Sequence, residues 1–257
     1  MSDLYIETRG HGEIPLVLVH GWAMHGGVFE PLAEKLDSRC TLYRVDLPGH
    51  GRSRNSTLAL DPRACAQYLC KQLPAAVWLG WSMGGLFALT AALEEPDKVL
   101  GLAMLSSTPR FVRDTDWPHG MDPDVFVQFS RDLHTDFRAT LDRFLALEAM
   151  GSAHAREEIR QLRASVLAPG EPDPSVLTQG LDLLEHSDLR ARLSQLCMPS
   201  AWIAGRRDRL VPPDAMRWSA QQCGGDFTCI EHAGHAAFLG FADDVVEALE
   251  PLLETAT

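Results

Sequence analysis

Short apolar runs alternate with segments of helical periodicity through much of the chain. Residues 16–19 and 99–105 are continuous apolar runs, which is typical of strands buried on both faces of a parallel sheet. Further strands are expected at 4–8, 40–45, 76–79, 201–204 and 227–230, and helices at 28–36, 61–72, 86–93 and 238–253. This alternation predicts right-handed β-α-β crossovers, a mostly parallel sheet and an α/β fold.

The alternation stops between residues 113 and 185, where apolar residues recur at helical spacing and no segment has the pattern of a strand. Four helices are expected there, at 123–133, 137–150, 153–168 and 173–184, with Gly151 after the second and Pro169-Gly170 ending the third. We therefore predict an α/β core formed by residues 1–112 and 186–257, and an inserted helical cap at 113–185 that covers the site. The alternative is that these helices simply pack on the sheet.

A serine lies where the predicted strand at 76–79 passes into a helix. Residues 80–84 read Gly-Trp-Ser-Met-Gly, which matches the G-x-S-x-G motif in its strand–turn–helix context. Gly80 and Gly84 are expected to leave room for the neighbouring backbone of a strained turn. The N-terminus of the following helix favours developing negative charge. This context predicts that Ser82 is a nucleophile, and it disfavours a glycine-rich turn with an incidental serine.

The partners of Ser82 are expected in loops that follow later strands, because these loops meet at one edge of a parallel sheet. Asp208 and His235 lie in such loops, and they give the chain order Ser, Asp, His. We expect Ser82 to attack a carbonyl carbon, His235 to accept the serine proton, and Asp208 to orient the imidazole. The amides of Trp22 and Met83 are expected to bind the oxyanion.

Each partner has a rival in the sequence. His232 is an alternative base, although Gly234 and the position beyond the turn favour His235. Asp182 or Asp188 is an alternative acid, although neither follows a predicted strand. Structural roles are expected for the remaining side chains: His20 shapes its loop, His25 lies at the surface, and Trp81 forms a wall of the pocket.

Composition sets broad limits on the function. The chain has 257 residues, of which 46% are hydrophobic and 23% charged, and this fits a soluble domain with an inserted subdomain. A net charge of −12 without runs of like charge argues against general nucleic-acid binding. The six cysteines lack zinc spacing, and the first residues lack a signal-peptide pattern, so a cytoplasmic protein with reduced thiols is expected. No membrane span, metal or cofactor is indicated.

The motifs together resemble the α/β-hydrolase superfamily over essentially the whole chain. They are His-Gly-Trp at 20–22, Asp-Leu-Pro-Gly-His-Gly-Arg-Ser at 46–53, Gly-Trp-Ser-Met-Gly-Gly at 80–85, and the loops of Asp208 and His235. Residues 78–82, the cap stretch 143–147 and Met150-Gly151 are further similar to the family of pimeloyl-[acyl-carrier protein] methyl ester esterases. The cap stretch is the more specific signal, because caps vary most between activities.

This resemblance implies a serine esterase of biotin biosynthesis. Its substrate is a pimeloyl methyl ester carried by acyl carrier protein, and its products are methanol and the free carboxylate on the carrier. The resemblance also implies that the following residues touch the substrate: Trp22, Ser82, Met83, Phe144, Leu145, Ala146, Leu147, Glu148 and His235.

The implied partner, acyl carrier protein, is acidic, so an acidic enzyme needs a local basic patch to bind it. Arg156, Arg160 and Arg163 share one helix face by their spacing. The expected docking residues are Arg138, Arg143, Arg156 and Arg160. The alternative is that these arginines only aid solubility. The family pattern has an arginine at the position of Ala139, and this chain has Arg138 beside it.

Other functions use the same motifs. A broad-specificity carboxylesterase or thioesterase for short acyl esters would use the same three residues, and only the cap distinguishes it. A non-catalytic ligand-binding member of the fold is the other alternative. A monomer is expected.

Overall fold

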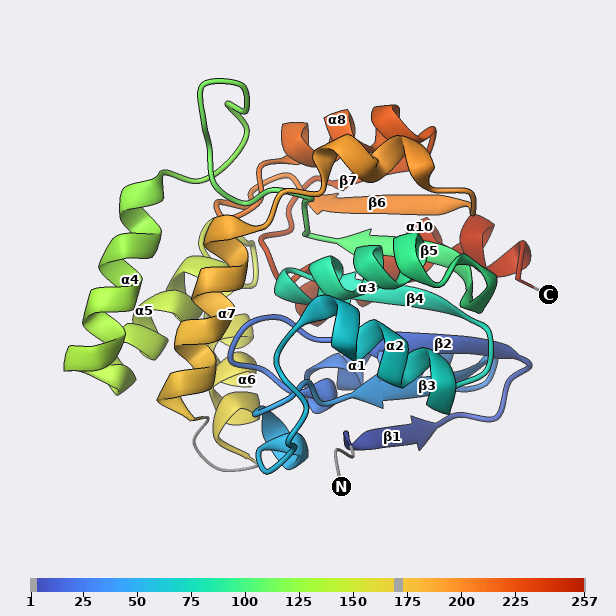
Figure 1. Cartoon of the computed structure of the whole chain (residues 1–257), viewed down its shortest axis with the longest axis horizontal. Helices are drawn as coiled ribbons and strands as arrows, with labels where there is room; N and C mark the ends of the chain where they lie inside the picture. The colour runs from blue at the N-terminus through green and yellow to red at the C-terminus, as the bar shows by residue number, and fades with distance from the viewer. Residues whose placement is uncertain (1–3, 169–172, 257) are drawn as a thin grey trace.

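A computed structural model gives the structure of the chain and describes residues 4–168 and 173–256. Within these residues seven strands form one sheet in the order β1-β3-β2-β4-β5-β6-β7 (Figure 1). β1 pairs antiparallel with β3, and all other neighbours are parallel. The strands are β1 (Ile6–Arg9), β2 (Ile14–Val19), β3 (Cys40–Val45), β4 (Ala76–Trp81), β5 (Val99–Leu105), β6 (Ser200–Gly205) and β7 (Asp226–Ile230).

Helices cover both faces of the sheet. α1 (Glu30–Leu36) and α10 (Ala242–Glu254) pack together on one face, and α2 (Pro62–Gln72) and α3 (Met83–Glu94) pack together on the other (Figure 1). Every residue of β4 is buried, as are most residues of α3. This double coverage explains why the central strands are continuous apolar runs and why α3 is apolar all round.

Shorter elements complete the core. α8 (Pro213–Cys223) packs on β6 and β7, and α9 (Ala237–Gly240) precedes α10. The 3₁₀ helices are η1 (Gly26–Phe29), η2 (Gly51–Ser53), η3 (Pro96–Lys98) and η4 (Arg190–Gln195).

Four helices separate β5 from β6: α4 (Pro123–Thr135), α5 (Phe137–Glu148), α6 (Ala155–Leu167) and α7 (Pro174–His186). They lie together beyond the carboxyl ends of the parallel strands (Figure 1). The expected block of helices is therefore present, while the division into a core and a cap at residues 112/113 and 185/186 stays a prediction. Pro169 and Gly170, which we expect to end the third of these helices, lie outside the described residues.

The α/β-hydrolase architecture predicted from the sequence is confirmed, with differences in detail. The predicted helix at 61–72 begins where Asp61 accepts a hydrogen bond from the Ala64 amide at 2.8 Å. The predicted last helix is divided at Phe241 into α9 and α10. α8 is absent from the sequence prediction.

His25 joins the loop after β2 to α6, so its expected surface position is wrong. The side chain is buried, because α6 covers the loop after β2. Nδ1 of His25 accepts the Gly27 N–H at 3.1 Å, so Nε2 carries the proton and donates it to the main-chain oxygen of Ser165 at 2.9 Å. Burial lowers the pKa of His25, which keeps the imidazole neutral in this role.

We expect His25→Ala to lower the free energy of unfolding by about 0.5–1.5 kcal/mol, because the hydrogen bond between the loop after β2 and the Ser165 carbonyl is lost, while that carbonyl still accepts the Ala168 amide at 3.2 Å. Urea denaturation followed by circular dichroism measures this change. Ser165→Ala is the matched control, since it keeps the main-chain acceptor and is expected to cost less. Equal losses in the two variants would contradict this role of the ring.

Candidate active site

Ser82 lies at the sharp junction of β4 and α3. Its backbone angles are φ +55° and ψ −124°, a left-handed conformation that strains a residue with a side chain. A Cβ atom at Gly80 would lie 2.5 Å from the Gly84 oxygen, and one at Gly84 would lie 2.1 Å from the Val19 oxygen. The steric need for both glycines, expected from the sequence, is confirmed.

The neighbouring strand holds the turn in place. The Ser82 amide donates to the Leu105 carbonyl at 3.1 Å, and the Ser107 hydroxyl donates to the Ser82 carbonyl at 2.6 Å. A Cβ atom at Gly85 would lie 2.0 Å from that hydroxyl oxygen. The backbone of the predicted nucleophile is thus bonded on both sides of its Cα. The supporting role of Ser107 was not predicted, and its position after a buried strand was the available signal.

The structure brings His235 and Asp208 together. Nδ1 of His235 lies 2.8 Å from Oδ2 of Asp208, and both side chains are fully buried. Oδ1 of Asp208 accepts the amides of Leu210 at 2.8 Å and Val211 at 3.0 Å, which leaves Oδ2 for the imidazole. A carboxylate on Nδ1 places the ring proton there, so Nε2 is the basic nitrogen. Nε2 has no hydrogen-bond partner within the described part of the chain.

The rival residues lie elsewhere. His232 is exposed, and its Nδ1 lies 3.0 Å from the Arg207 guanidinium. Asp188 is paired with Arg190 at 2.7 Å, and Asp182 is exposed on α7. The geometry therefore favours the pair formed by His235 and Asp208.

Trp81 supports His235 from the core side. Its indole N–H donates to the His235 carbonyl at 3.0 Å, and its ring lies 5.7 Å from the imidazole between centroids. The other side of the indole packs against Phe29 and Phe238. The expectation that Trp81 forms a wall of the pocket is wrong, because the side chains lining the cavity over Ser82 do not include it.

The loop after β2 runs beside the nucleophile. A Cβ atom at Gly21 would lie 3.2 Å from Cβ of Ser82. Nε2 of His20 accepts the Leu47 amide at 3.0 Å, so Nδ1 carries the proton and donates to the Gly21 carbonyl at 2.7 Å. Burial, with the nearby His50 ring, lowers the pKa of His20 well below its ordinary value. The neutral ring thus shapes the loop, as predicted.

The two predicted oxyanion residues meet a cap helix. The Met83 amide opens α3 and has no acceptor within its own helix. The Trp22 indole N–H donates to the Leu177 carbonyl on α7 at 2.8 Å. A Cβ atom at Gly180 would lie 2.6 Å from Cδ1 of Trp22 and 3.2 Å from the Met83 sulfur. The lack of a side chain at Gly180 therefore lets α7 rest against both residues.

A small cavity lies over Ser82, with a volume of about 20 Å³. Apart from Ser82 its lining is apolar: Phe111, Met121, Val125, Phe126, Phe129, Phe144, Leu181, Leu184 and Leu210. This volume accommodates about one water molecule, so an acyl chain requires the cavity to widen.

Of the expected substrate contacts in α5, only Phe144 lines this cavity. Its ring packs 4.6 Å from the Trp22 ring between centroids. Leu145 lines a separate groove of about 330 Å³ between α5 and α6, and Ala146 is exposed. Leu147 is half-buried, and Glu148 is fully buried. The lining residues from α4 and α7 were not identified from the sequence.

The turn between α5 and α6 is attached to both loops that carry the predicted catalytic pair. The His235 amide donates to the Glu148 carbonyl at 3.0 Å, and the Ala153 amide donates to the His232 carbonyl at 3.1 Å. The Arg207 guanidinium donates to the carbonyl of Gly151 at 3.1 Å. The turn between α5 and α6 is therefore hydrogen-bonded to both loops.

The arginines expected to bind a carrier protein are exposed. Two of them are engaged in ion pairs, Arg143 with Asp132 at 2.6 Å and Arg160 with Glu157, and the nearby Arg163 pairs with Asp142 at 2.9 Å. The span of α6 places Arg156, Arg160 and Arg163 on one helix face, as their spacing predicts.

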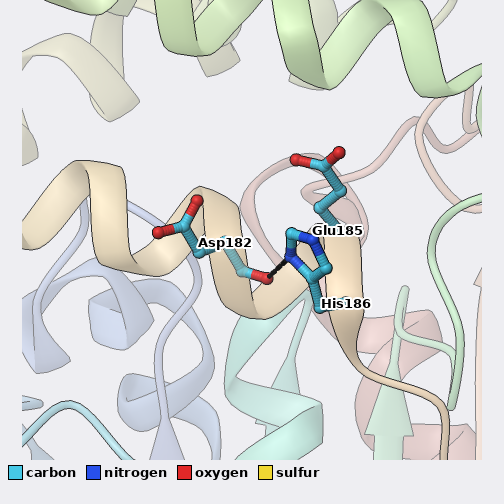
Figure 2. Close-up of side chains that lie close together, drawn as sticks. All are labelled: Asp182, Glu185 and His186. Atoms are coloured by element: carbon cyan, nitrogen blue, oxygen red, sulfur yellow. Dashed lines mark hydrogen bonds between the residues drawn. The ribbon is translucent and has the colours of Figure 1, made fainter.

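One group of possible metal ligands occurs among the described residues, on α7 (Figure 2). The ligand atoms of Asp182, Glu185 and His186 lie within 4.8 Å of one another. Nδ1 of His186 lies 2.9 Å from the main-chain oxygen of Asp182, which leaves Nε2 for another partner. Such exposed groups are common without a metal, and we assign no metal site to them. Separately, no helix in the described ranges combines the length and apolar character needed to cross a membrane.

Solved structures share this architecture. An esterase from Exiguobacterium antarcticum superposes with a TM-score of 0.87 at 22% identity, covering 98% of this chain and 95% of that chain. An esterase from Thermogutta terrifontis superposes with a TM-score of 0.83 at 23% identity, covering 99% and 94%. At these identities the likeness shows the fold alone.

Sequence comparison identifies nearer relatives. The sequence model of the family described as alpha/beta hydrolase fold matches residues 14–242. The chain is 54% identical over 248 residues to the pimeloyl-[acyl-carrier protein] methyl ester esterase of Stenotrophomonas maltophilia, covering 96% of this chain and 95% of that protein. It is 53% identical over 247 residues to the enzyme of the same name from Xanthomonas campestris pv. campestris, covering 96% and 97%. The chain therefore belongs to the alpha/beta hydrolase family, within the group of the pimeloyl-[acyl-carrier protein] methyl ester esterases.

Proposed function

We propose that this protein is a serine carboxylesterase that hydrolyses the methyl ester of pimeloyl-[acyl-carrier protein] to methanol and pimeloyl-[acyl-carrier protein] in biotin biosynthesis. The observation that carries the chemistry is the buried pair of His235 and Asp208, 2.8 Å apart, at the strand edge that also presents Ser82 on its strained turn. The substrate class is supported by the relatives that share more than half of the sequence.

In the first half-reaction Ser82 Oγ attacks the ester carbonyl carbon, and Nε2 of His235 accepts the hydroxyl proton. The amides of Trp22 and Met83 stabilise the oxyanion. The bond from carbon to the methoxy oxygen then breaks, and methanol leaves with the proton held by His235. Asp208 keeps the imidazole in the correct tautomer and stabilises its charged form.

In the second half-reaction a water molecule attacks the acyl-enzyme carbonyl while His235 accepts one water proton. The bond to Ser82 Oγ breaks, and His235 returns the proton to the serine. The product forms as a carboxylic acid that keeps the second water proton and then releases it to solvent as a carboxylate, and the thioester to the carrier is intact.

The apolar lining of the cavity suits a methylene chain, which buries no hydrogen-bonding group along its length. The substrate contains two cleavable carbonyls, a thioester and a methyl ester. If the carrier holds the thioester at the mouth, the chain length selects the carbonyl that reaches Ser82.

The residues that line the cavity indicate how the methylene chain of the substrate enters it. Val125 and Phe129 of α4 line both the small cavity over Ser82 and an outer groove of about 410 Å³. Arg143 and Asp132 also line the outer groove. The turn between α5 and α6 is bonded to the loop of His235. The path therefore opens when α4 shifts, which joins the groove and the cavity while the His235 loop stays in place.

The carrier protein is bound by the exposed arginine face of α6 together with Arg138 and Arg143 of α5. Electrostatic repulsion between two acidic proteins is screened beyond about 8 Å at physiological salt, so local charges set the approach. Arg156 and Arg160 lie one turn apart on α6. Arg160 pairs with Glu157 within the chain. Carboxylates on an acidic helix of the carrier would replace Glu157 as the partner of Arg160.

Mass spectrometry of purified pimeloyl-carrier-protein methyl ester tests the activity directly. We expect the wild type to remove the methyl group and to leave the thioester intact. Ser82→Ala is expected to lower this rate at least about 10³-fold, because the nucleophile is lost. Thioester cleavage, or activity on short esters only, would replace the proposed substrate with that of a general esterase or thioesterase.

The double charge reversal Arg156→Glu with Arg160→Glu tests docking. It is expected to lower kcat/KM for the carrier-bound ester about tenfold or more, a loss of roughly 1.4 kcal/mol of binding free energy. Turnover of p-nitrophenyl acetate is expected to change less than about twofold.

The matched control for docking is Arg54→Glu with Arg63→Glu, which changes the net charge equally at exposed positions outside the cap. The docking site is wrong if both double variants lower kcat/KM for the carrier-bound ester to the same extent.

A further inference from the structure

Glu148 is a buried acid without a visible partner. It is the last residue of α5, its exposed fraction is 0%, and neither carboxyl oxygen has a hydrogen-bond partner among the described residues. Its main-chain oxygen accepts the amide of His235 at 3.0 Å. Buried carboxylates are normally paired or hydrogen-bonded, so the charged form has no support at this position.

The surroundings also oppose a negative charge on Glu148. The C-terminal end of a helix carries partial negative charge from its free carbonyl groups. Burial, and then the charge of Asp208, raise the pKa of Glu148 well above its ordinary value.

The other titratable groups on the adjoining elements have partners, although one carboxyl oxygen of buried Glu158 has none among the described residues and burial raises the pKa of Glu158. Arg207 and His232 lie 3.0 Å apart on the two loops, His235 is paired with Asp208, and Glu158 on α6 accepts the Ser152 hydroxyl at 2.5 Å. No described cation therefore pairs with Glu148.

We propose that Glu148 is a positioning residue that is held as an uncharged carboxylic acid, so that the end of α5 stays packed beside Asp208 while its main chain fixes the His235 loop. Loss of its proton places a second negative charge beside Asp208 without solvent. That charge drives the end of α5 outward and takes the His235 amide with it. Glu148 thereby sets the alkaline limit of activity. The catalytic part of this inference rests on the proposed role of His235.

The sign of the linked stability change follows from proton binding. In the unfolded chain Glu148 loses its proton near its ordinary pKa, whereas the folded protein keeps it to higher pH. The stability contributed by the protonated form is complete below the unfolded pKa. It is lost progressively as pH rises toward the folded pKa. Glu148→Gln removes this loss, because an amide of the same shape does not ionise.

The first test compares melting temperatures of wild type and Glu148→Gln by calorimetry between about pH 4.5 and pH 9. We expect little difference at the acid end, and at about pH 8 a gain of at least about 3 °C for the variant. Glu157→Gln is the matched control, because Arg160 lowers the pKa of this exposed acid to about 2, and no such gain is expected. A variant that is less stable than wild type at about pH 8 overturns the proposal, since the carboxylate would then be charged and supported.

The second test measures kcat/KM for p-nitrophenyl acetate against pH. Glu148→Ala is expected to lose at least about tenfold, and Glu148→Gln is expected to recover most of that loss and to keep activity to higher pH than wild type. If kcat/KM of Glu148→Gln and of the wild type falls at the same alkaline pH, the proposal is overturned. If Glu148→Gln does not fold, Glu148→Met repeats the stability test. Neither measurement uses the carrier-bound ester. Both tests therefore remain valid if the proposed substrate is wrong.

Discussion

The close crossing of β4, α3 and the loop after β2 is the constraint on which the rest of the site depends. A Cβ atom at Gly84 would lie 2.1 Å from the Val19 oxygen, and one at Gly21 would lie 3.2 Å from Cβ of Ser82. No other residue fits at Gly84 without separating the helix from the sheet. The same crossing places the proposed oxyanion donor, the Met83 amide, next to the proposed nucleophile at the start of α3. The two proposed sites therefore share one piece of backbone geometry, and the strand and helix that hold it are almost entirely buried.

The helices above this crossing are joined to it unequally. The turn after α5 is hydrogen-bonded to the loops of Asp208 and His235, and His25 joins α6 to the core. α7 rests on Trp22 through the glycine at position 180. α4 contributes apolar side chains to the small cavity over Ser82. Apolar contacts are less directional than hydrogen bonds, so α4 is the segment whose displacement disturbs the catalytic geometry least.

Features encoded in neighbouring residues could be predicted from the sequence. The strands, the glycines around Ser82 and the order of Ser82, Asp208 and His235 are of this kind. α8 was missed because its buried face consists of small or polar residues apart from Met216, which gives a weak apolar period. Burial of His25 depends on Ser165, 140 residues further along the chain. The cavity lining and the isolation of Glu148 likewise depend on how separate helices meet, and no local pattern encodes that.

The apolar lining of the cavity has a consequence for the direction of the reaction. An ester is neutral, but the acid released from it is an anion at neutral pH. Among the side chains that line the space over Ser82, only the serine itself is polar, and Asp208 lies behind His235. An anion there has no side-chain counter-ion in the lining and a carboxylate nearby, so the apolar walls favour the neutral ester over the charged acid. The main-chain amides of the proposed oxyanion site act in the opposite sense, so the lining and the backbone of this pocket favour different charge states of the bound group.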